Sequence, residues 1–154
     1  ENKEQYDVLC SFQVLEHIPE VDSFLRAKIE ALKPGGTLLI CVPNNDSFIS
    51  KDSLNVLNMP PHHMGLWNES SLKYLAKKYD LELLDMRLEP MEERHYEWYF
   101  NVQLREKFGF WLGLILQKLL TITGLNKLAF PKIRAKAKEI KGHSVFVAFK
   151  KKAS

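Results

Sequence analysis

The chain has 154 residues, which is enough for one domain with its own hydrophobic core and too few for two domains of ordinary size. Its hydrophobic content of 45% and charged content of 27% are ordinary for a globular protein. The formal net charge of +3 is too small to predict a nucleic-acid partner, although lysine and arginine concentrate between residues 132 and 152.

The first predicted unit is a strand, a helix and a second strand. Residues 6–10 are a short run of strand-forming side chains, and apolar residues then recur at helical spacing from residue 21 to residue 32. Residues 33–36 end this helix, because proline cannot continue it and glycine accepts a positive φ angle. Residues 37–42 are apolar without interruption, which predicts a strand buried on both faces and parallel to the first.

The two cysteines, Cys10 and Cys41, lie inside these predicted strands. We interpret both as small buried hydrophobic residues, since their spacing fits neither a metal site nor a redox pair. This pattern favours a reducing cytoplasm, and a disulfide between the two neighbouring strands is the alternative. Residues 1–5 are polar and charged and show no signal-peptide pattern, so we expect a cytoplasmic protein.

The sheet begins abruptly at its first strand, and an open strand edge invites pairing with another chain. We therefore expect one of two arrangements. Either the chain is the C-terminal piece of a larger domain, or it completes its sheet by association, as a homo-oligomer that pairs at this edge. In open parallel sheets ligands lie outside the carboxyl ends of the strands. Residues 11–17 and 43–46 are accordingly the segments expected to carry function.

The second half of the chain predicts another helix and two further strands. Asn68 is a good N-cap for a helix that ends near Tyr79, and Asp80 follows where glycine would adopt a left-handed conformation more easily. Residues 81–88 alternate as a half-buried strand does, and residues 144–149 form a second strand that suits antiparallel pairing with it.

Between these two strands lies an insertion at about residues 90–142, long enough to have structure of its own. Residues 108–122 are apolar on all sides but too short and too interrupted to span a bilayer, and a lysine-rich helix at residues 131–141 follows. Three interpretations of the apolar segment stay open: a lid over the acceptor, a dimer interface, or a helix in peripheral contact with a membrane. Because such runs are commonly buried, a lid or a dimer interface is favoured over membrane contact.

Two motifs in the first unit occur in a fixed order. V-L-E-H stands at residues 14–17 and L-K-P-G-G at residues 32–36, and Pro-Asn follows at residues 43–44. Together they resemble the class I S-adenosylmethionine-dependent methyltransferases, in which the first motif follows the fourth strand and the second precedes the fifth. The resemblance continues through P-P-H-H at residues 60–63 and W-N-E-S-S-L at residues 67–72.

The resemblance implies an α/β, Rossmann-like methyltransferase fold that is partial. The chain would supply strands four to seven, with the last strand antiparallel and a helical insertion before it. The first strand of the family, its glycine-rich turn and the acidic residue after its second strand have no counterpart here. We therefore expect this chain alone to bind S-adenosylmethionine poorly or not at all, and a micromolar affinity in calorimetric titration would contradict that expectation.

The resemblance also assigns candidate site residues. Ser11, Phe12 and Gln13 are the cofactor-binding candidates, because the family position that matches Phe12 contacts the methyl donor. His17 is a catalytic candidate, with a helix cap or a core hydrogen bond as the equally weighted alternative. His62 and its neighbour in the P-P-H-H loop, which should lie over the strand ends, are the remaining catalytic candidates.

The adjacent pair His62 and His63 is the only hint of a metal site, and no third ligand stands at convincing spacing, so no metal is predicted. A general base or an acceptor contact is the better interpretation of these loop histidines, and ordinary surface residues are the alternative.

The expected function is methyl transfer from S-adenosylmethionine to a small-molecule or lipid- or glycan-linked acceptor, with oxygen, nitrogen and carbon acceptors all open. The alternative keeps the fold without the activity, as a methyltransferase-like scaffold or partner subunit. A dehydrogenase-like nucleotide-binding domain is a third and remote interpretation.

Overall fold

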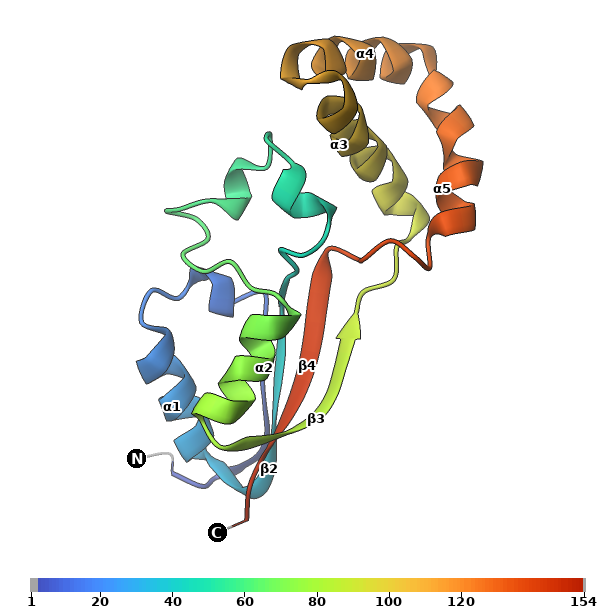
Figure 1. Cartoon of the computed structure of the whole chain (residues 1–154). Helices are drawn as coiled ribbons and strands as arrows, with labels where there is room; N and C mark the ends of the chain where they lie inside the picture. The colour runs from blue at the N-terminus through green and yellow to red at the C-terminus, as the bar shows by residue number, and fades with distance from the viewer. Residues whose placement is uncertain (1–2, 154) are drawn as a thin grey trace.

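The computed structural model describes residues 3–153 and shows a four-stranded mixed sheet with the strand order β1-β2-β4-β3 (Figure 1). The strands are β1 (Tyr6–Phe12), β2 (Leu32–Pro43), β3 (Leu81–Leu88) and β4 (Ser144–Lys151). β1 and β2 are parallel, whereas β4 runs antiparallel to both of its neighbours. The predicted partial α/β fold and its antiparallel last strand are confirmed.

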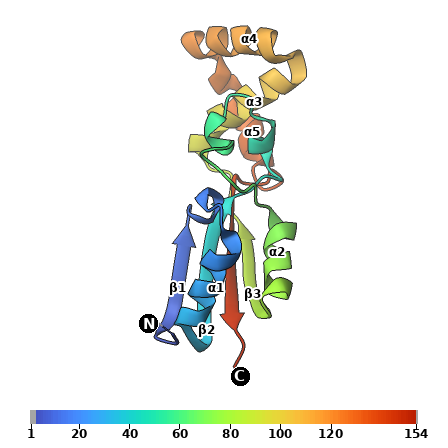
Figure 2. The ribbon, with the colours of Figure 1, turned by 90° about the vertical axis from the view of Figure 1, so that its left-hand side faces the viewer.

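The helices divide into two that cover the sheet and three that form the insertion. The first group is α1 (Val21–Ala31) and α2 (Glu69–Lys78), and the second is α3 (Tyr96–Phe108), α4 (Phe110–Thr123) and α5 (Phe130–Lys136). Short 3-10 turns connect them: η1 (Leu15–His17), η2 (Phe48–Lys51), η3 (Val56–Asn58), η4 (Glu93–His95) and η5 (Leu125–Ala129). The insertion stands beyond the carboxyl ends of β1 and β2 (Figures 1 and 2).

The L-K-P-G-G motif differs from its predicted role as a plain turn. α1 ends at Ala31, and β2 already begins at Leu32. Tyr6 pairs with Leu32 and Val8 with Thr37, so the four residues between Leu32 and Thr37 bulge out of the ladder. The proline and the first glycine, whose φ angle is +79°, permit this bulge because neither continues a regular strand.

The prediction that the first two strands are buried on both faces is wrong. Along β2, Leu38 and Ile40 are fully buried, whereas Cys41 is only half-buried and Cys10 on β1 is exposed. The physical reason is that α1 and α2 pack against the same face and share one hydrophobic core with the sheet. Among residues 3–153 no helix covers the opposite face (Figure 2).

The start of α2 follows its prediction. The side chain of Asn68 accepts a hydrogen bond of 2.8 Å from the backbone N–H of Ser71, and the Ser71 hydroxyl accepts one of 2.9 Å from the Asn68 N–H. This reciprocal cap satisfies two donors that a helix start leaves free. Asp80 has a φ angle of +52°, so it adopts the left-handed conformation that ends this segment.

The insertion is attached to the rest of the molecule by a second hydrophobic core and a buried ion pair. Phe48 and Ile49, in the turn after β2, pack with Tyr96 and Val102 of α3. Asp52 is hydrogen-bonded to the guanidinium of Arg105 on α3, and both side chains are at least nine-tenths buried. The loop after β2 therefore holds the insertion over the strand ends.

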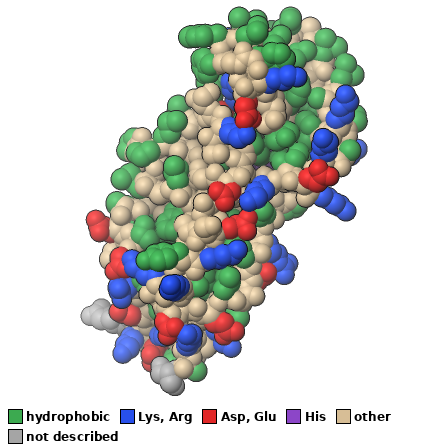
Figure 3. Space-filling model, viewed as in Figure 1, with side chains coloured by type: hydrophobic (Ala, Val, Ile, Leu, Met, Phe, Trp, Pro, Cys, Tyr) green, Lys and Arg blue, Asp and Glu red, His purple; other side chains and the backbone are tan. Residues whose placement is uncertain are grey.

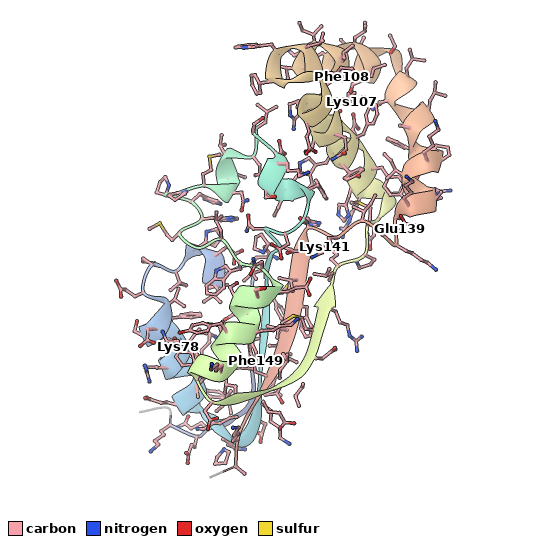
Figure 4. All side chains as sticks on the ribbon, in the orientation of Figure 1. Lys78, Lys107, Phe108, Glu139, Lys141 and Phe149 are labelled. Carbon is pink, nitrogen blue, oxygen red and sulfur yellow. The ribbon has the colours of Figure 1, made fainter. Side chains whose placement is uncertain are left out.

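The most apolar helix of the insertion, α4, is largely exposed. Trp111 is 77% and Ile122 is 85% exposed, and Gly113 is its one buried residue. Figure 3 shows hydrophobic side chains gathered at the end of the molecule that α4 forms, and Figure 4 places Lys107 and Phe108 where α3 turns into it. The expected burial of this segment is not found within one chain.

Over residues 3–153 the helices are all too short or too polar to cross a bilayer. The expected lysine-rich helix is shorter than 131–141, because α5 ends at Lys136.

Candidate functional site at the carboxyl ends of the strands

The carboxyl ends of β1 and β2 meet at one edge of the sheet, as predicted. Phe12 is paired with Cys41, and the backbone N–H of Gln13 donates a hydrogen bond of 2.8 Å to the Cys41 carbonyl. Two features lie at this edge. One is a cleft on the uncovered face of the sheet, and the other is a cluster of histidines that begins four residues beyond Gln13, at His17.

The cleft has a volume of about 660 Å³ and lies where the uncovered face meets the insertion. Its lining includes Gln13, Cys41, Arg87, Glu89, Ser144 and Phe146. With Asp85, which also lines it, the cleft combines two carboxylates and one guanidinium with an apolar floor, a composition typical of small-molecule sites.

The three cofactor-binding candidates take different positions around the cleft. Gln13 has a φ angle of +53° and turns its side-chain amide toward the Cys41 sulfur, 3.7 Å away. Phe12 is exposed, and its ring centroid lies 6.5 Å from that of Phe146. Ser11 is buried and, by strand alternation, belongs to the helix-covered face, so it does not line the cleft.

Cys41 is the nucleophilic side chain of this cleft, and its surroundings suppress its reactivity. Burial is the main cause that raises the pKa of its thiol, and the carboxylates of Glu89 and Glu16 raise it further, while the hydrogen bond from Gln13 acts in the opposite direction. A raised thiol pKa leaves less thiolate at neutral pH, and the thiolate is the reactive form.

We expect Ellman's reagent to label Cys10 before Cys41 at pH 7, because Cys10 is exposed and Cys41 is half-buried with a raised pKa. In a Cys10→Ser variant, the labelling rate of Cys41 should rise with pH through and beyond the ordinary thiol range. Stopped-flow absorbance measures both rates. Equal rates for the two thiols at pH 7 would contradict the burial of Cys41.

The three catalytic candidates come together in space, although His17 is 45 residues from His62. The ring centroid of His17 lies 4.8 Å from that of His62 and 4.8 Å from that of His63, and the two loop histidines stack 5.1 Å apart. One nitrogen from each ring lies within 4.8 Å of the others. We call His17, His62 and His63 the histidine cluster.

Backbone hydrogen bonds fix the loop that carries two members of this cluster. The N–H groups of Met64 and Gly65 donate to the carbonyl of Glu16 at 2.7 and 3.1 Å. The Nδ1 atom of His17 lies 2.8 Å from the His62 carbonyl oxygen. The P-P-H-H loop is therefore tied directly to the V-L-E-H turn, which explains why these two motifs form one site.

A buried carboxylate lies behind the histidine cluster. Glu16 is 1% exposed, and neither of its carboxylate oxygens has a hydrogen-bond partner among the described residues. Burial raises the pKa of Glu16, and the backbone and the nearby His17 and His62 lower it in part. The pKa of His63 is lowered, first by burial and then by the two neighbouring imidazoles.

A second titratable group, which the sequence did not single out, lies where the insertion joins the sheet. His143 Nδ1 is 3.3 Å from Glu89 Oε2, an ion contact rather than a directed hydrogen bond, and the rings of His95 and His143 are 4.6 Å apart. The pKa of His143 is lowered, chiefly by burial, with Glu89 opposing this effect. Glu89 also accepts from Arg94 at 3.0 Å. No periodicity marks these residues, since they lie in the two crossing segments that enter and leave the insertion.

A family model for a methyltransferase domain matches residues 1–86, which is more than half of the chain. The chain therefore belongs to the class I S-adenosylmethionine-dependent methyltransferases, as the two motifs predicted.

Curated relatives match over part of their length. The chain is 33% identical over 73 residues to a ubiquinone biosynthesis O-methyltransferase from Marinobacter nauticus, an alignment that covers 45% of this chain and 31% of that protein. A protein of the same name from Hydrogenovibrio crunogenus is 28% identical over 90 residues, which covers 53% of this chain and 37% of the relative. The matched segments thus span about a third of these relatives.

Solved structures share the fold at low sequence identity. A SAM-dependent methyltransferase from Archaeoglobus fulgidus matches 97% of this chain and 61% of its own, with a TM-score of 0.56 and 13% identity. The cyclase SpnF matches 100% of this chain and 52% of its own, with a TM-score of 0.55 and 15% identity. These likenesses show the fold alone, since one fold serves more than one chemistry.

Proposed function

We propose that this chain forms the acceptor-facing part of a domain that transfers a methyl group from S-adenosylmethionine to a small-molecule or lipid- or glycan-linked acceptor. The observation that carries this proposal is the adjacency of the cleft and the histidine cluster at one edge of the sheet. Gln13 lines the cleft and Glu16 directly precedes His17 of the cluster, and the carboxylates of Glu89 and Glu16 both raise the pKa of Cys41.

The roles follow from position. Phe12 offers a ring and Gln13 an amide on the donor side, where the strand ends of an α/β sheet receive a ligand. The histidine cluster faces the acceptor. The acceptor heteroatom attacks the methyl carbon, the bond between carbon and sulfur breaks as the new bond forms, and S-adenosylhomocysteine leaves. The proton of the acceptor passes to an imidazole, whose pKa range suits this transfer at neutral pH.

An oxygen acceptor is the first class to test. The names of the curated relatives describe O-methyltransferases, and methyl transfer to a hydroxyl requires removal of a proton that an imidazole can accept.

The test is a thermal-shift titration of the complete gene product with S-adenosylhomocysteine, because a ligand that binds only the folded form must raise the melting temperature. At a hundredfold excess over the dissociation constant the stabilisation is about 2.7 kcal/mol. In the Cys10→Ser variant, the same ligand should slow the labelling of Cys41 at the cleft. Absence of both effects at millimolar ligand would overturn the proposal. A shift with no protection of Cys41 would overturn the placement of the donor in this cleft.

A further inference from the structure

We propose that the histidine cluster binds a divalent transition-metal ion of the zinc class through His17, His62 and His63, with the carboxylate of Glu16 supplying negative charge behind the ligands. The binding claim is independent of methyl transfer. Only the use of the ion in catalysis, described below, rests on the proposed function.

Hydrogen bonding leaves two of the three rings ready to bind a cation. A carbonyl oxygen only accepts, so the 2.8 Å contact to the His62 carbonyl places the proton of neutral His17 on Nδ1 and leaves the Nε2 lone pair free. His63 Nδ1 lies 3.1 Å from the side-chain oxygen of Asn58, whose amide nitrogen donates to Asn45 at 2.8 Å. That second bond orients the Asn58 amide with its oxygen toward His63. Metal-binding histidines characteristically donate their other ring N–H to such an oxygen.

The carboxylate of Glu16 is the independent observation that points to a cation. It is almost fully buried, it lacks a hydrogen-bond donor among the described residues, and its Oε1 lies 3.9 Å from His17 Nε2. A buried carboxylate without a partner is costly, and the cost is relieved when a positive ion binds beside it. A divalent ion held by the three imidazoles would supply that charge.

The donor set selects the metal. Three imidazole nitrogens suit zinc, cobalt and nickel, whereas magnesium and calcium prefer sites made of oxygen. A tetrahedral zinc ion with Zn–N bonds near 2.0–2.1 Å holds its ligand nitrogens about 3.4 Å apart. The present nitrogens lie within 4.8 Å of one another, so the rings would close by at most about 1.4 Å when the ion binds. His17 and His62 are exposed and can turn, so a fourth coordination position of the ion would be open to solvent.

In the proposed reaction the ion would receive the acceptor oxygen at this open position. With all three imidazoles acting as ligands, the ion would replace them in removing the acceptor proton: coordination lowers the pKa of a hydroxyl group, the proton would pass to solvent, and the acceptor would attack the methyl carbon as an oxyanion. The carbon–sulfur bond breaks and neutral S-adenosylhomocysteine departs, which balances the step without a further reactant.

The test measures metal binding with neither donor nor acceptor present. Purified chain is stripped with a chelator and titrated with Zn²⁺ by calorimetry and with Co²⁺ by visible absorption, and elemental analysis gives the stoichiometry. We expect one ion per chain, and ligand-field absorption of Co²⁺ that signals fewer than six ligands. His17→Ala, His62→Ala and His63→Ala should each weaken Zn²⁺ binding by at least 10-fold. Glu16→Gln should weaken it by about 10- to 100-fold, as loss of supporting groups around metal ligands does.

Two controls make the result decisive. His143→Ala alters the other group of potential ligands, Glu89, His95 and His143, and should leave Zn²⁺ affinity unchanged. Urea unfolding of the metal-free Glu16→Gln variant should show no loss of stability, which separates a charge needed by the ion from a structural role. The proposal is overturned by the absence of saturable Zn²⁺ binding, by loss of binding in His143→Ala, or by a preference for Mg²⁺ over Zn²⁺. Zinc binding by the chain, together with no methyl transfer by the complete gene product, would leave the site standing and reject the proposed function.

Discussion

Replacing Asp52 by alanine should lower the free energy of unfolding by about 3–5 kcal/mol, because it leaves the guanidinium of Arg105 buried without a counter-ion. Asp52 bonds both Arg105 and the indole N–H of Trp98, the latter at 2.6 Å. Arg105 also donates to Gln117 on α4, so the loss reaches two helices of the insertion. Urea unfolding followed by tryptophan fluorescence measures the change, since Trp98 reports directly on this contact.

A nearby exposed pair provides the matched control for Asp52. Lys51 and Glu106 form an ion pair between the same two segments, and both side chains are largely exposed. Lys51→Ala should therefore change stability by no more than about 1 kcal/mol. A second variant, Asp52→Leu with Arg105→Met, removes both charges and should recover much of the loss. Similar effects for Asp52→Ala and Lys51→Ala would show that burial does not strengthen the inner pair.

Gly142→Ala should destabilise the chain by about 3 kcal/mol, the upper end of the usual cost of overpacking. A Cβ atom at this position would lie 1.6 Å from the Glu89 carbonyl oxygen and 2.6 Å from its carbon. Both atoms belong to the backbone, so no side-chain rotation relieves the overlap. The Asn44 side chain donates a 3.1 Å hydrogen bond to the Gly142 carbonyl, and this bond should be strained as the segments separate. Thermal unfolding and limited proteolysis within residues 90–142 measure the effect.

Gly124→Ala separates this steric effect from ordinary glycine behaviour. Gly124 has a φ angle of +72°, but nothing lies within 4 Å of the position of its Cβ atom. Gly124→Ala should lower the free energy of unfolding by only about 1–2 kcal/mol, the strain of placing a side chain in the left-handed backbone conformation. It should not increase proteolysis near residue 142. Equal proteolytic sensitivity in the two variants would contradict the close crossing of the segments at Gly142 and Glu89.

Local patterns sufficed for the elements and the family, because helical spacing, capping and strand runs are properties of neighbouring residues. The Asn68 cap and the antiparallel last strand followed from them. The periodicity of the sequence does not show that both covering helices pack on the same face of the sheet. For that reason Cys10 was expected to be buried, whereas the structure shows it exposed. That choice depends on packing among elements distant in the sequence.

The candidate site was predicted residue by residue but not as a group. His17, His62 and His63 were each selected, yet the sequence did not show that their rings lie together, because spacing along the chain does not reveal that the fold brings His17 next to His62, 45 residues away. The buried carboxylate of Glu16 had no signal beyond its place in V-L-E-H. The Asp52–Arg105 pair joins residues 53 apart and likewise had none.

The position of β4 between β2 and β3 has an evolutionary consequence. The insertion departs from the end of β3 and returns at the start of its hydrogen-bonded neighbour β4, so both junctions sit side by side. A segment inserted between two adjacent strand ends can become longer or shorter, or be replaced by another segment, without shifting the register of any strand.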